Sequence, residues 1–441
     1  EPHSQKHPPF SSPGKACMAL LRIHRVSGEE AATLSAEDLK DLTDIHGDSV
    51  KGLKLHLQDI LGVPRYQLRL AHGRRTLQDE EALTALCHTS ASFQLVVQSL
   101  YPAQNEELKR LVAAAEKGAE LEVESLLQWP LNPTFLLKGG KIPLQMAAKK
   151  GHTEVAKLLL EAKADKNQVN RQGATALWLA AECGRLETAQ LLVSQGADLD
   201  LPDVGGTSPL WIASSRSHLA MVKLLLEAGA DKDKPGVDGA SPMWIAARSF
   251  HWGVVRLLLE AGADKDAANR RGTSPLWIAA ARNHLVLVQW LLDAGAFKDR
   301  ADRHGVTPLW AASADGHAAV VRLLLRAGAA KDALDNSGAS PLWIASARGS
   351  LAVVELLLDS GANPNQASKT GESPLWIAAW NGHRDVVSAL IEAGADKDQA
   401  NCFGKTPLQA AAERKHGQVK RVFQSFEPEC PRRNRKKARI E

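Results

Sequence analysis

The chain has 441 residues, of which 44% are hydrophobic and 24% are charged, and this composition is ordinary for a folded protein. Its 54 basic and 50 acidic residues leave a net charge of +4, so no overall field selects nucleic acid or a membrane as the partner. The five cysteines include no CxxC pair, which favours a reducing compartment and argues against a disulfide framework or a zinc knuckle.

Residues 1–17 are rich in proline and serine and contain no apolar stretch of the kind found in a secretion signal. We expect them to be disordered or to be an artefact of cloning or gene assembly, with Met18 as the native start. No apolar run in the chain approaches the roughly 18 residues that a membrane-spanning helix needs, so we expect no membrane partner.

Residues 18–101 form the first predicted domain, a small α+β unit. Residues 19–26 alternate as a strand does, a second strand follows the turn at 27–30, and residues 66–72 and 93–100 predict two more strands. Helical spacing predicts one amphipathic helix over 49–62, with these residues inward: Val50, Leu53, Leu57, Ile60 and Leu61. The order of these elements indicates a small mixed sheet with one helix.

The helix and the segment after it are similar to ubiquitin, which implies a β-grasp fold. The residues that match ubiquitin are Gly62-Val63-Pro64, Arg69-Leu70, Gly73, Leu77 and Asp79. No Gly-Gly terminus follows Leu100, so we do not expect a conjugated modifier. Of the apolar patch that partners of ubiquitin grip, Val96 is kept, and Ala71 or Leu70 stands in place of an isoleucine. The resemblance implies a ubiquitin-pathway partner; the alternative is a plain folding or interaction module.

Residues 102–136 are predicted to be a helical linker, with helix over 105–133. Gly118 lies 33 residues before Gly151, in phase with the period of the segment that follows. We therefore interpret 102–136 as a linker with a degenerate repeat that caps a stack.

A 33-residue period runs through residues 137–427, where nine units follow one another without an insertion. A glycine keeps this step from Gly140 to Gly404, and a tryptophan keeps it at Trp178, Trp211, Trp244, Trp277, Trp310, Trp343 and Trp376. A fixed period of this length is typical of stacked repeats.

One unit, residues 272–304, can be read in detail. Ser274 and Pro275 predict the start of a short helix. Leu285, Val288, Leu291 and Leu292 predict a second, amphipathic helix, which Gly295 ends in a left-handed turn. Neither helix can bury its apolar face alone, so the units must stack.

These units resemble ankyrin repeats, whose turn glycine, TPLH-x-A, GH, LLL and GAD are matched by GVTPLW, DGHAAVVRLLLRAGA and GKTPLQAAA. The resemblance implies a mainly α fold, an ankyrin-repeat α-solenoid of about nine units preceded by the β-grasp domain. The tryptophan departs from the family pattern, in which a histidine usually bonds to the loop of a neighbouring repeat.

The seven tryptophans predict a structural ladder, in which each indole packs on the next unit and donates its N–H to the adjacent loop. The alternative is an aromatic strip that stacks on bases or binds a peptide. Gln145 and Gln409 replace the tryptophan in the first and last units, where we expect a neighbour to be missing, and this favours the ladder.

Two other periodic residue types are predicted to be structural or solvated. Histidines one repeat apart are too distant to share a metal ion, so we predict no metal and no cofactor. The alternating charges of the DK(D/N) loops predict a solvated surface.

Positions that vary between units are the candidates for recognition, because the ankyrin resemblance implies that loop tips and the ends of first helices line a concave face for a protein partner. The predicted partner-binding residues are Arg171, Arg216, Arg270, Arg271, Arg282, Arg303, Arg348, Trp380 and Phe403. The arginines at 270, 271, 282 and 303 fall in adjacent units and favour an acidic partner. Tryptophan and arginine also dominate the energetics of protein interfaces.

Residues 428–441 are predicted to be a disordered basic tail, with six lysines and arginines between Arg432 and Arg439. The chain has no P-loop, kinase or GxSxG signature, so we predict a non-enzymatic scaffold or adaptor in the cytoplasm. The alternative is a nuclear regulatory protein that uses the tail for import or for contact with nucleic acid.

Overall fold

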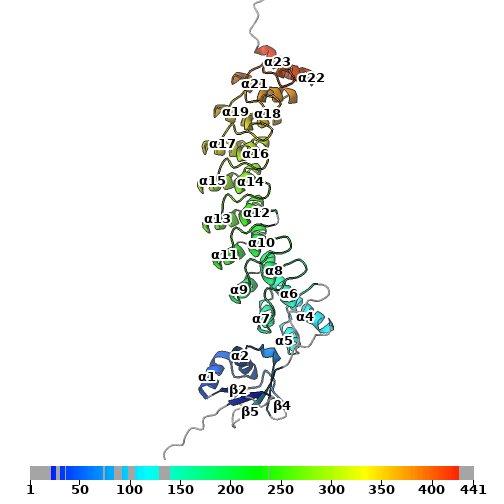
Figure 1. Ribbon diagram of the computed structural model, residues 1–441, viewed down its shortest axis with the longest axis vertical. Coiled ribbons are helices and arrows are strands. Elements are labelled where there is room, and N and C mark those ends of the chain that lie inside the picture. Colours follow the sequence, from blue (N-terminus) through cyan, green and yellow to red (C-terminus); the bar gives the residue numbers. More distant parts are fainter. Residues whose placement is uncertain are drawn as a thin grey trace, which may run out of the picture. The chain divides into compact units, whose positions relative to one another are not determined.

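The structure, a computed structural model, describes residues 21–25, 30–34, 36–72, 75–83, 92–97, 105–128, 140–236 and 238–426. The predicted leader at 1–17 and the predicted tail at 428–441 lie outside these residues. The chain divides into two compact units, Glu1–Ala197 and Asp198–Glu441 (Figure 1).

Unit 1 begins with a five-stranded sheet in the order β2-β1-β5-β3-β4. Its strands are β1 (Leu21–Arg25), β2 (Glu30–Leu34), β3 (Leu68–His72), β4 (Arg75–Thr76) and β5 (Ser92–Val97). The first and last strands, β1 and β5, pair in parallel, and the other neighbours are antiparallel. The predicted mixed sheet is present, although β3 begins at Leu68 rather than at 66 because Arg65–Gln67 form a 3-10 turn (η1).

Two helices accompany this sheet, α1 (Ala36–His46) and α2 (Val50–Leu61), so the expectation of one helix is wrong. Helix α2 is the predicted one. The Ser49 hydroxyl accepts the Gly52 N–H at its start, and the left-handed Gly62 ends it. The apolar periodicity of helix α1 is weak in the sequence because the helix buries few residues. Leu42 is in the core, but Ile45 is 73% exposed.

One face of α2 and alternate residues of the strands make the core of the sheet domain: Val50, Leu53, Leu57, Ile23, Leu68, Leu70, Phe93 and Leu95. Ile60, predicted to face inward, is 52% exposed. At 100° per residue it falls at the edge of the apolar stripe, in the last turn of α2.

The rest of unit 1 consists of three helix pairs in its described residues. They are α4 (Asn105–Lys117) with α5 (Glu120–Leu127), α6 (Pro143–Lys150) with α7 (Thr153–Glu161), and α8 (Ala176–Cys183) with α9 (Leu186–Ser194). The turn between α4 and α5 is at Gly118, and the ring of His152 lies against this glycine and bonds through Nε2 to the Glu116 carbonyl at 3.2 Å. His383 lies against Gly349 in the same way, so the α4/α5 pair stacks as the later repeats do.

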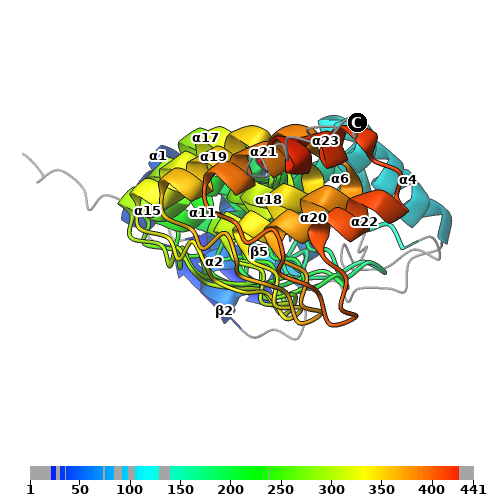
Figure 2. The same ribbon diagram turned by 90° about the horizontal axis from the view of Figure 1, so that it is seen from above.

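Unit 2 contains seven further pairs within its described residues. The first helices are α10 (Pro209–Ser215), α12 (Pro242–Arg248), α14 (Pro275–Ala281), α16 (Pro308–Ala314), α18 (Pro341–Arg348), α20 (Pro374–Asn381) and α22 (Pro407–Glu413). The second helices are α11 (Leu219–Glu227), α13 (Trp252–Glu260), α15 (Leu285–Asp293), α17 (Ala318–Arg326), α19 (Leu351–Asp359), α21 (Arg384–Glu392) and α23 (Gly417–Ser425). Within this unit the first helices form one row and the second helices another, and Figure 2 shows that its loops project to one side.

The local signals of the repeat work as predicted. The Ser274 hydroxyl accepts the N–H of Trp277 at 3.1 Å, and Pro275 is the first helical residue. In helix α15 the residues buried in the stack are Leu287, Val288 and Leu291. Leu285, predicted inward, is 40% exposed because it is the first residue of the helix.

Candidate interaction surface

Six indoles of unit 2 donate a hydrogen bond to the loop of the following repeat. Each Nε1 reaches the carbonyl oxygen 29 residues later at 2.9 to 3.2 Å, in the pairs Trp211–Ala240, Trp244–Thr273, Trp277–Val306, Trp310–Ala339, Trp343–Glu372 and Trp376–Lys405. In unit 1, Trp178 is buried. A buried indole N–H that finds a partner avoids the penalty of an unmade hydrogen bond.

The two glutamines at the ends of this file differ from each other. The Gln145 amide donates to the Ala174 carbonyl at 3.0 Å and to the Gln168 carbonyl at 2.8 Å. A neighbouring loop is therefore present there, and the expectation that it would be missing is wrong for Gln145. Gln409 instead accepts the Thr406 N–H and completes a capping box at its own helix.

Backbone hydrogen bonds hold the loop tips of unit 2 in a row. The Arg270 N–H donates to the Asp238 carbonyl at 2.8 Å, and the Arg303 N–H donates to the Arg271 carbonyl at 3.0 Å. The same bond recurs in the pairs Asn336–His304, Lys369–Ser337 and Cys402–Thr370. The side chains of Arg270, Arg271 and Arg303 are exposed, so three cations stand side by side on adjacent loops.

Acidic side chains below the tips join successive loops. Asp233 Oδ1 accepts the Asp264 N–H at 2.8 Å, and Asp266 Oδ1 accepts the Phe297 N–H at 2.8 Å. Asp266 is only 5% exposed. The prediction of a solvated charge is wrong for this aspartate, because the DK(D/N) motif caps the backbone of the next loop.

The other predicted partner-binding residues lie either at loop tips or at the ends of first helices. Arg171, Arg216, Arg282 and Arg348 are exposed, and Phe403 is 77% exposed at the last loop tip. Trp380 is half-buried: its ring stacks on that of Trp376 at 5.2 Å between centroids, and the Arg414 guanidinium lies 4.3 Å from its centroid. Trp380 is thus packed against its own stack rather than presented as an open anchor.

The turn between α12 and α13 was not predicted as a site and departs from its counterparts. Phe250 has φ +66°, at a turn position that is left-handed in every repeat of unit 2: smaller or unbranched residues stand there at Ser217, Asn283 and Lys415, and glycine at 316, 349 and 382. A bulky residue in this left-handed region is an outlier, and the conformation costs about 1–2 kcal/mol. The phrase SFHW at 249–252, which places a bulky aromatic residue at this turn position, is the signal that could have found it.

His284, in the next turn, lacks the bond that its counterparts make. The Nε2 atoms of His251, His317, His383 and His416 each bond a carbonyl 36 residues earlier at 3.0 to 3.2 Å. His284 is 2% exposed, and its Nε2 has no partner. The centroids of the Phe250 and His284 rings are 3.5 Å apart, with the rings nearly perpendicular. Burial, aided by the charge of Arg282, lowers the pKa of His284.

This lowered pKa predicts a loss of stability in mild acid. Between the folded-state pKa and the ordinary value of 6.5, the unfolded chain binds more protons than the folded one. The contribution of the neutral His284 ring to the free energy of unfolding is therefore complete above pH 6.5 and is lost as the pH falls through the folded-state pKa. Urea unfolding at about pH 7.5 and 5.5 should show a larger loss for the wild-type chain than for His284→Gln. Equal losses would show that His284 titrates normally.

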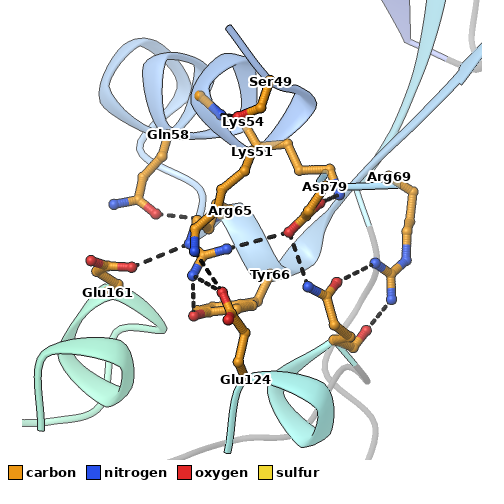
Figure 3. A network of polar contacts seen from close by, with 12 residues as sticks. Ser49, Lys51, Lys54, Gln58, Arg65, Tyr66, Arg69, Asp79, Glu124 and Glu161 are labelled. Carbon is orange, nitrogen blue, oxygen red and sulfur yellow. Dashed lines mark hydrogen bonds and ion pairs between the residues drawn. The ribbon is translucent and has the colours of Figure 1, made fainter. Parts of the chain in front are cut away.

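A buried polar network joins the sheet domain to helices α5 and α7 within unit 1 (Figure 3). Arg65 is fully buried and pairs with Glu124 of α5 at 3.2 Å, with Glu161 of α7 at 3.2 Å and with Asp79 at 3.3 Å. Its guanidinium also lies over the ring of Tyr66, whose pKa burial raises.

Two further contacts extend this network. Arg69 of β3 donates to the side chain and the carbonyl of Gln128, which follows α5. Asp79 accepts from Lys54, Gln128 and Arg65. Burial alone would raise the pKa of Asp79, but the bonds from Lys54 and Gln128 and the charge of Arg65 hold it below its usual value.

Two other kinds of site are absent from the described residues. Their His, Cys, Asp and Glu side chains form no group of three that could hold a metal ion. None of their helices combines the length and the apolar character needed to cross a bilayer.

The ankyrin repeat family model, which comprises three copies of the repeat, matches six overlapping segments. They are residues 111–203, 201–269, 253–335, 276–368, 326–401 and 342–432. A comparison with curated proteins finds no significant match. The family matches run from 111 to 432, which is more than half of the sequence, and they cover the helix pairs, the indole file and the loop row described above. The chain belongs to the ankyrin repeat family.

Proposed function

We propose that the chain is a non-enzymatic scaffold that holds an acidic protein partner on the loop tips of unit 2. Ankyrin repeats are a protein–protein interaction module, and this family membership supplies the general class of function. The observation that carries the finer proposal is the row of three exposed arginines, Arg270, Arg271 and Arg303, on adjacent loops.

The chemistry of this row suits a carboxylate-rich surface. The backbone bonds between tips fix the loops before binding, so less conformational entropy is lost when a partner docks. Three like charges held side by side repel one another, and a partner that presents Asp or Glu removes this repulsion while steering the encounter. Arginine adds bidentate hydrogen bonding to carboxylates.

We also propose that the sheet domain is ubiquitin-like and links the partner to ubiquitin-pathway machinery. The strand order β2-β1-β5-β3-β4 with a central parallel pair supports this β-grasp assignment. Leu70 is fully buried, so Ala71, paired with Gln94 across β5, takes the place of the ubiquitin isoleucine. Val96 is 38% exposed on the same strand pair, opposite Arg69.

Affinity capture with mass spectrometry tests the scaffold proposal. Reversing the charge at the tips (Arg270→Glu, Arg271→Glu and Arg303→Glu in one chain) should remove the acidic partners, with at least about a tenfold loss of recovery. The matched control reverses three exposed arginines on the second helices, Arg256→Glu, Arg322→Glu and Arg326→Glu, and should keep them. Equal recovery with both triple variants would refute binding at the tips.

A second arm of the same experiment tests the ubiquitin-like half. Val96→Asp in the full chain should lose ubiquitin-pathway proteins while the partners held at the tips remain, because it places a charge on the exposed face of the sheet. If Val96→Asp recovers every protein that the wild-type chain recovers, the ubiquitin link fails and the scaffold proposal stands alone.

A further inference from the structure

We propose that unit 2 has a second docking surface, formed by the turns between first and second helices of three consecutive repeats, and that it binds an acidic amphipathic segment of a partner protein. This surface, the turn patch, consists of Leu219, Phe250, Trp252, Leu285 and Val286, with Arg216, Arg248 and Arg282 at its edge. It is separate from the loop-tip surface and does not depend on it.

The apolar side chains of the turn patch are exposed and adjoin one another. Their exposed fractions run from 36% at Trp252 to 50% at Val286. Leu219 lies over Gly253, where an added Cβ would come within 2.8 Å of Leu219 Cδ2. The rings of Phe250 and Trp252 are 6.5 Å apart, and each packs edge-on against His284, the neighbour of Leu285 in the chain.

The turn patch lies at the far end of the first helices from the loop tips. Helix α14, for example, separates the loop arginine Arg271 from the turn arginine Arg282, and its seven residues span roughly 10 Å. The turns of the three repeats that follow carry glycine in place of Phe250, at Gly316, Gly349 and Gly382, and Ala318, Leu351 or Arg384 in place of Trp252. The aromatic centre therefore belongs to one place in the stack.

The charge around the turn patch selects the sign of the partner. Residues 214–222, 247–256 and 280–288 contain no Asp or Glu, and the exposed Arg216, Arg248 and Arg282 lie at the ends of the three first helices. An apolar centre with a cationic edge is complementary to a segment that has leucines or phenylalanines on one face and carboxylates on the other. Tryptophan with arginine is also the pairing enriched at energetically dominant protein contacts.

A protein segment fits this surface better than a membrane does. Lipid recognition by basic surfaces typically uses clusters of about 4–8 lysines and arginines, and the turn patch has three arginines spread over three repeats. Binding to lipid vesicles is therefore treated as the competing outcome in the experiment below.

The local structure of the turn patch also contains two features that destabilise the fold. Phe250 holds a left-handed conformation that glycine adopts freely, and the Nε2 atom of the buried His284 has no hydrogen-bond partner. Strained backbone and unpaired buried groups gather at functional sites, where the sequence is kept for binding rather than for the fold. Phe250→Gly should accordingly stabilise the chain or leave it unchanged.

Fluorescence anisotropy with a labelled synthetic peptide tests the proposal on the full chain. The probe is a helical peptide of about 18 residues, long enough to span three turns, with leucine and phenylalanine on one face and glutamate on the other. Saturable binding is expected. Trp252→Ala, Arg282→Glu and Phe250→Gly should each weaken it about tenfold or more. Replacing the glutamates with lysine, or the apolar residues with serine, should weaken the probe to a similar degree.

Control measurements separate this surface from the others. The triple loop-tip variant should bind the probe as the wild-type chain does, and Phe250→Gly should have an unchanged or higher thermal midpoint. The proposal is overturned if the probe shows no saturable binding, or if Trp252→Ala and Phe250→Gly bind it as well as the wild type. It is also overturned if phosphatidylserine vesicles bind the chain and Trp252→Ala abolishes that binding.

Discussion

Replacing Arg65 with alanine is expected to destabilise the contact between the sheet domain and helices α5 and α7 by about 3–5 kcal/mol. Arg65 is fully buried and is shared by Asp79, Glu124 and Glu161. Without the guanidinium, three carboxylates that are wholly or partly buried each lose a charged hydrogen-bond donor. Lys54 pairs with Asp79 and Lys51 pairs with Glu124, so neither lysine bridges all three carboxylates as Arg65 does. The loss therefore reflects uncompensated charge and not the small net value of an intact pair.

Hydrogen exchange measured by mass spectrometry can follow this loss within the full chain. Arg65→Ala should speed exchange in peptides that cover 65–72 and 120–128 and leave those of 242–426 unchanged. The matched control is Arg75→Ala, because Arg75 pairs with Glu81 but its side chain is 71% exposed. It should change exchange little, since exposed pairs contribute about 0–1 kcal/mol. Equal exchange in the two variants would contradict the role given to the network.

Acid should weaken the same contact. The pKa of Asp79 is held below its ordinary value of 3.8. Its stabilising contribution is therefore complete above that value and is lost as the pH falls through the lower folded-state pKa.

Trp244→Ala is expected to cost unit 2 about 3–5 kcal/mol of unfolding free energy, the usual range for truncating a large buried aromatic side chain. Trp244 is 5% exposed, and its indole N–H donates to both the carbonyl and the hydroxyl of Thr273 in the next repeat. The substitution opens a cavity and leaves the Thr273 carbonyl without this donor, so both effects act in the same direction.

Two further variants show how much of this loss comes from the N–H donor and how much is specific to the indole file. Trp244→Phe keeps a ring but removes the donor, and it should cost about 1–3 kcal/mol. Trp252→Ala removes a tryptophan outside the indole file that is 36% exposed, and it should change stability little. Guanidinium unfolding followed by circular dichroism measures all three. A Trp244→Ala variant as stable as Trp252→Ala would show that the indole file does not support the stack.

Much of the repeat could be predicted because its signals are local and recur many times. The Ser274-Pro275 start and the left-handed Gly295 depend on a few neighbouring residues, and each has counterparts one period away. The position of the loop arginines also follows from the period alone. The bond between each indole and the carbonyl 29 residues later was expected as a contact with the adjacent loop, but the particular carbonyl needed the three-dimensional register.

The remainder depends on contacts between residues far apart in the chain. Nothing in the sequence distinguishes Arg65 from the other arginines. Only the fold brings it next to Glu124 and Glu161, which are 59 and 96 residues away. Helix α1 escaped prediction because a helix with one core leucine has little apolar period. In the sequence Phe250 stands out only as a bulky residue at a turn position where other repeats have Gly, Ser, Asn or Lys. The unpaired Nε2 atom of His284 beside it requires atomic positions.

Site-specific photo-cross-linking tests the central claim, that stacked repeats present their loop tips to an acidic protein partner. A photoreactive residue is introduced in place of Arg271 at a loop tip, or in place of Arg326 at the end of a second helix, and cross-linked proteins are identified. Cross-links to an acidic protein from position 271, and none to that protein from 326, are predicted. The same partners cross-linked with equal yield from both positions, or from 326 alone, would contradict the account.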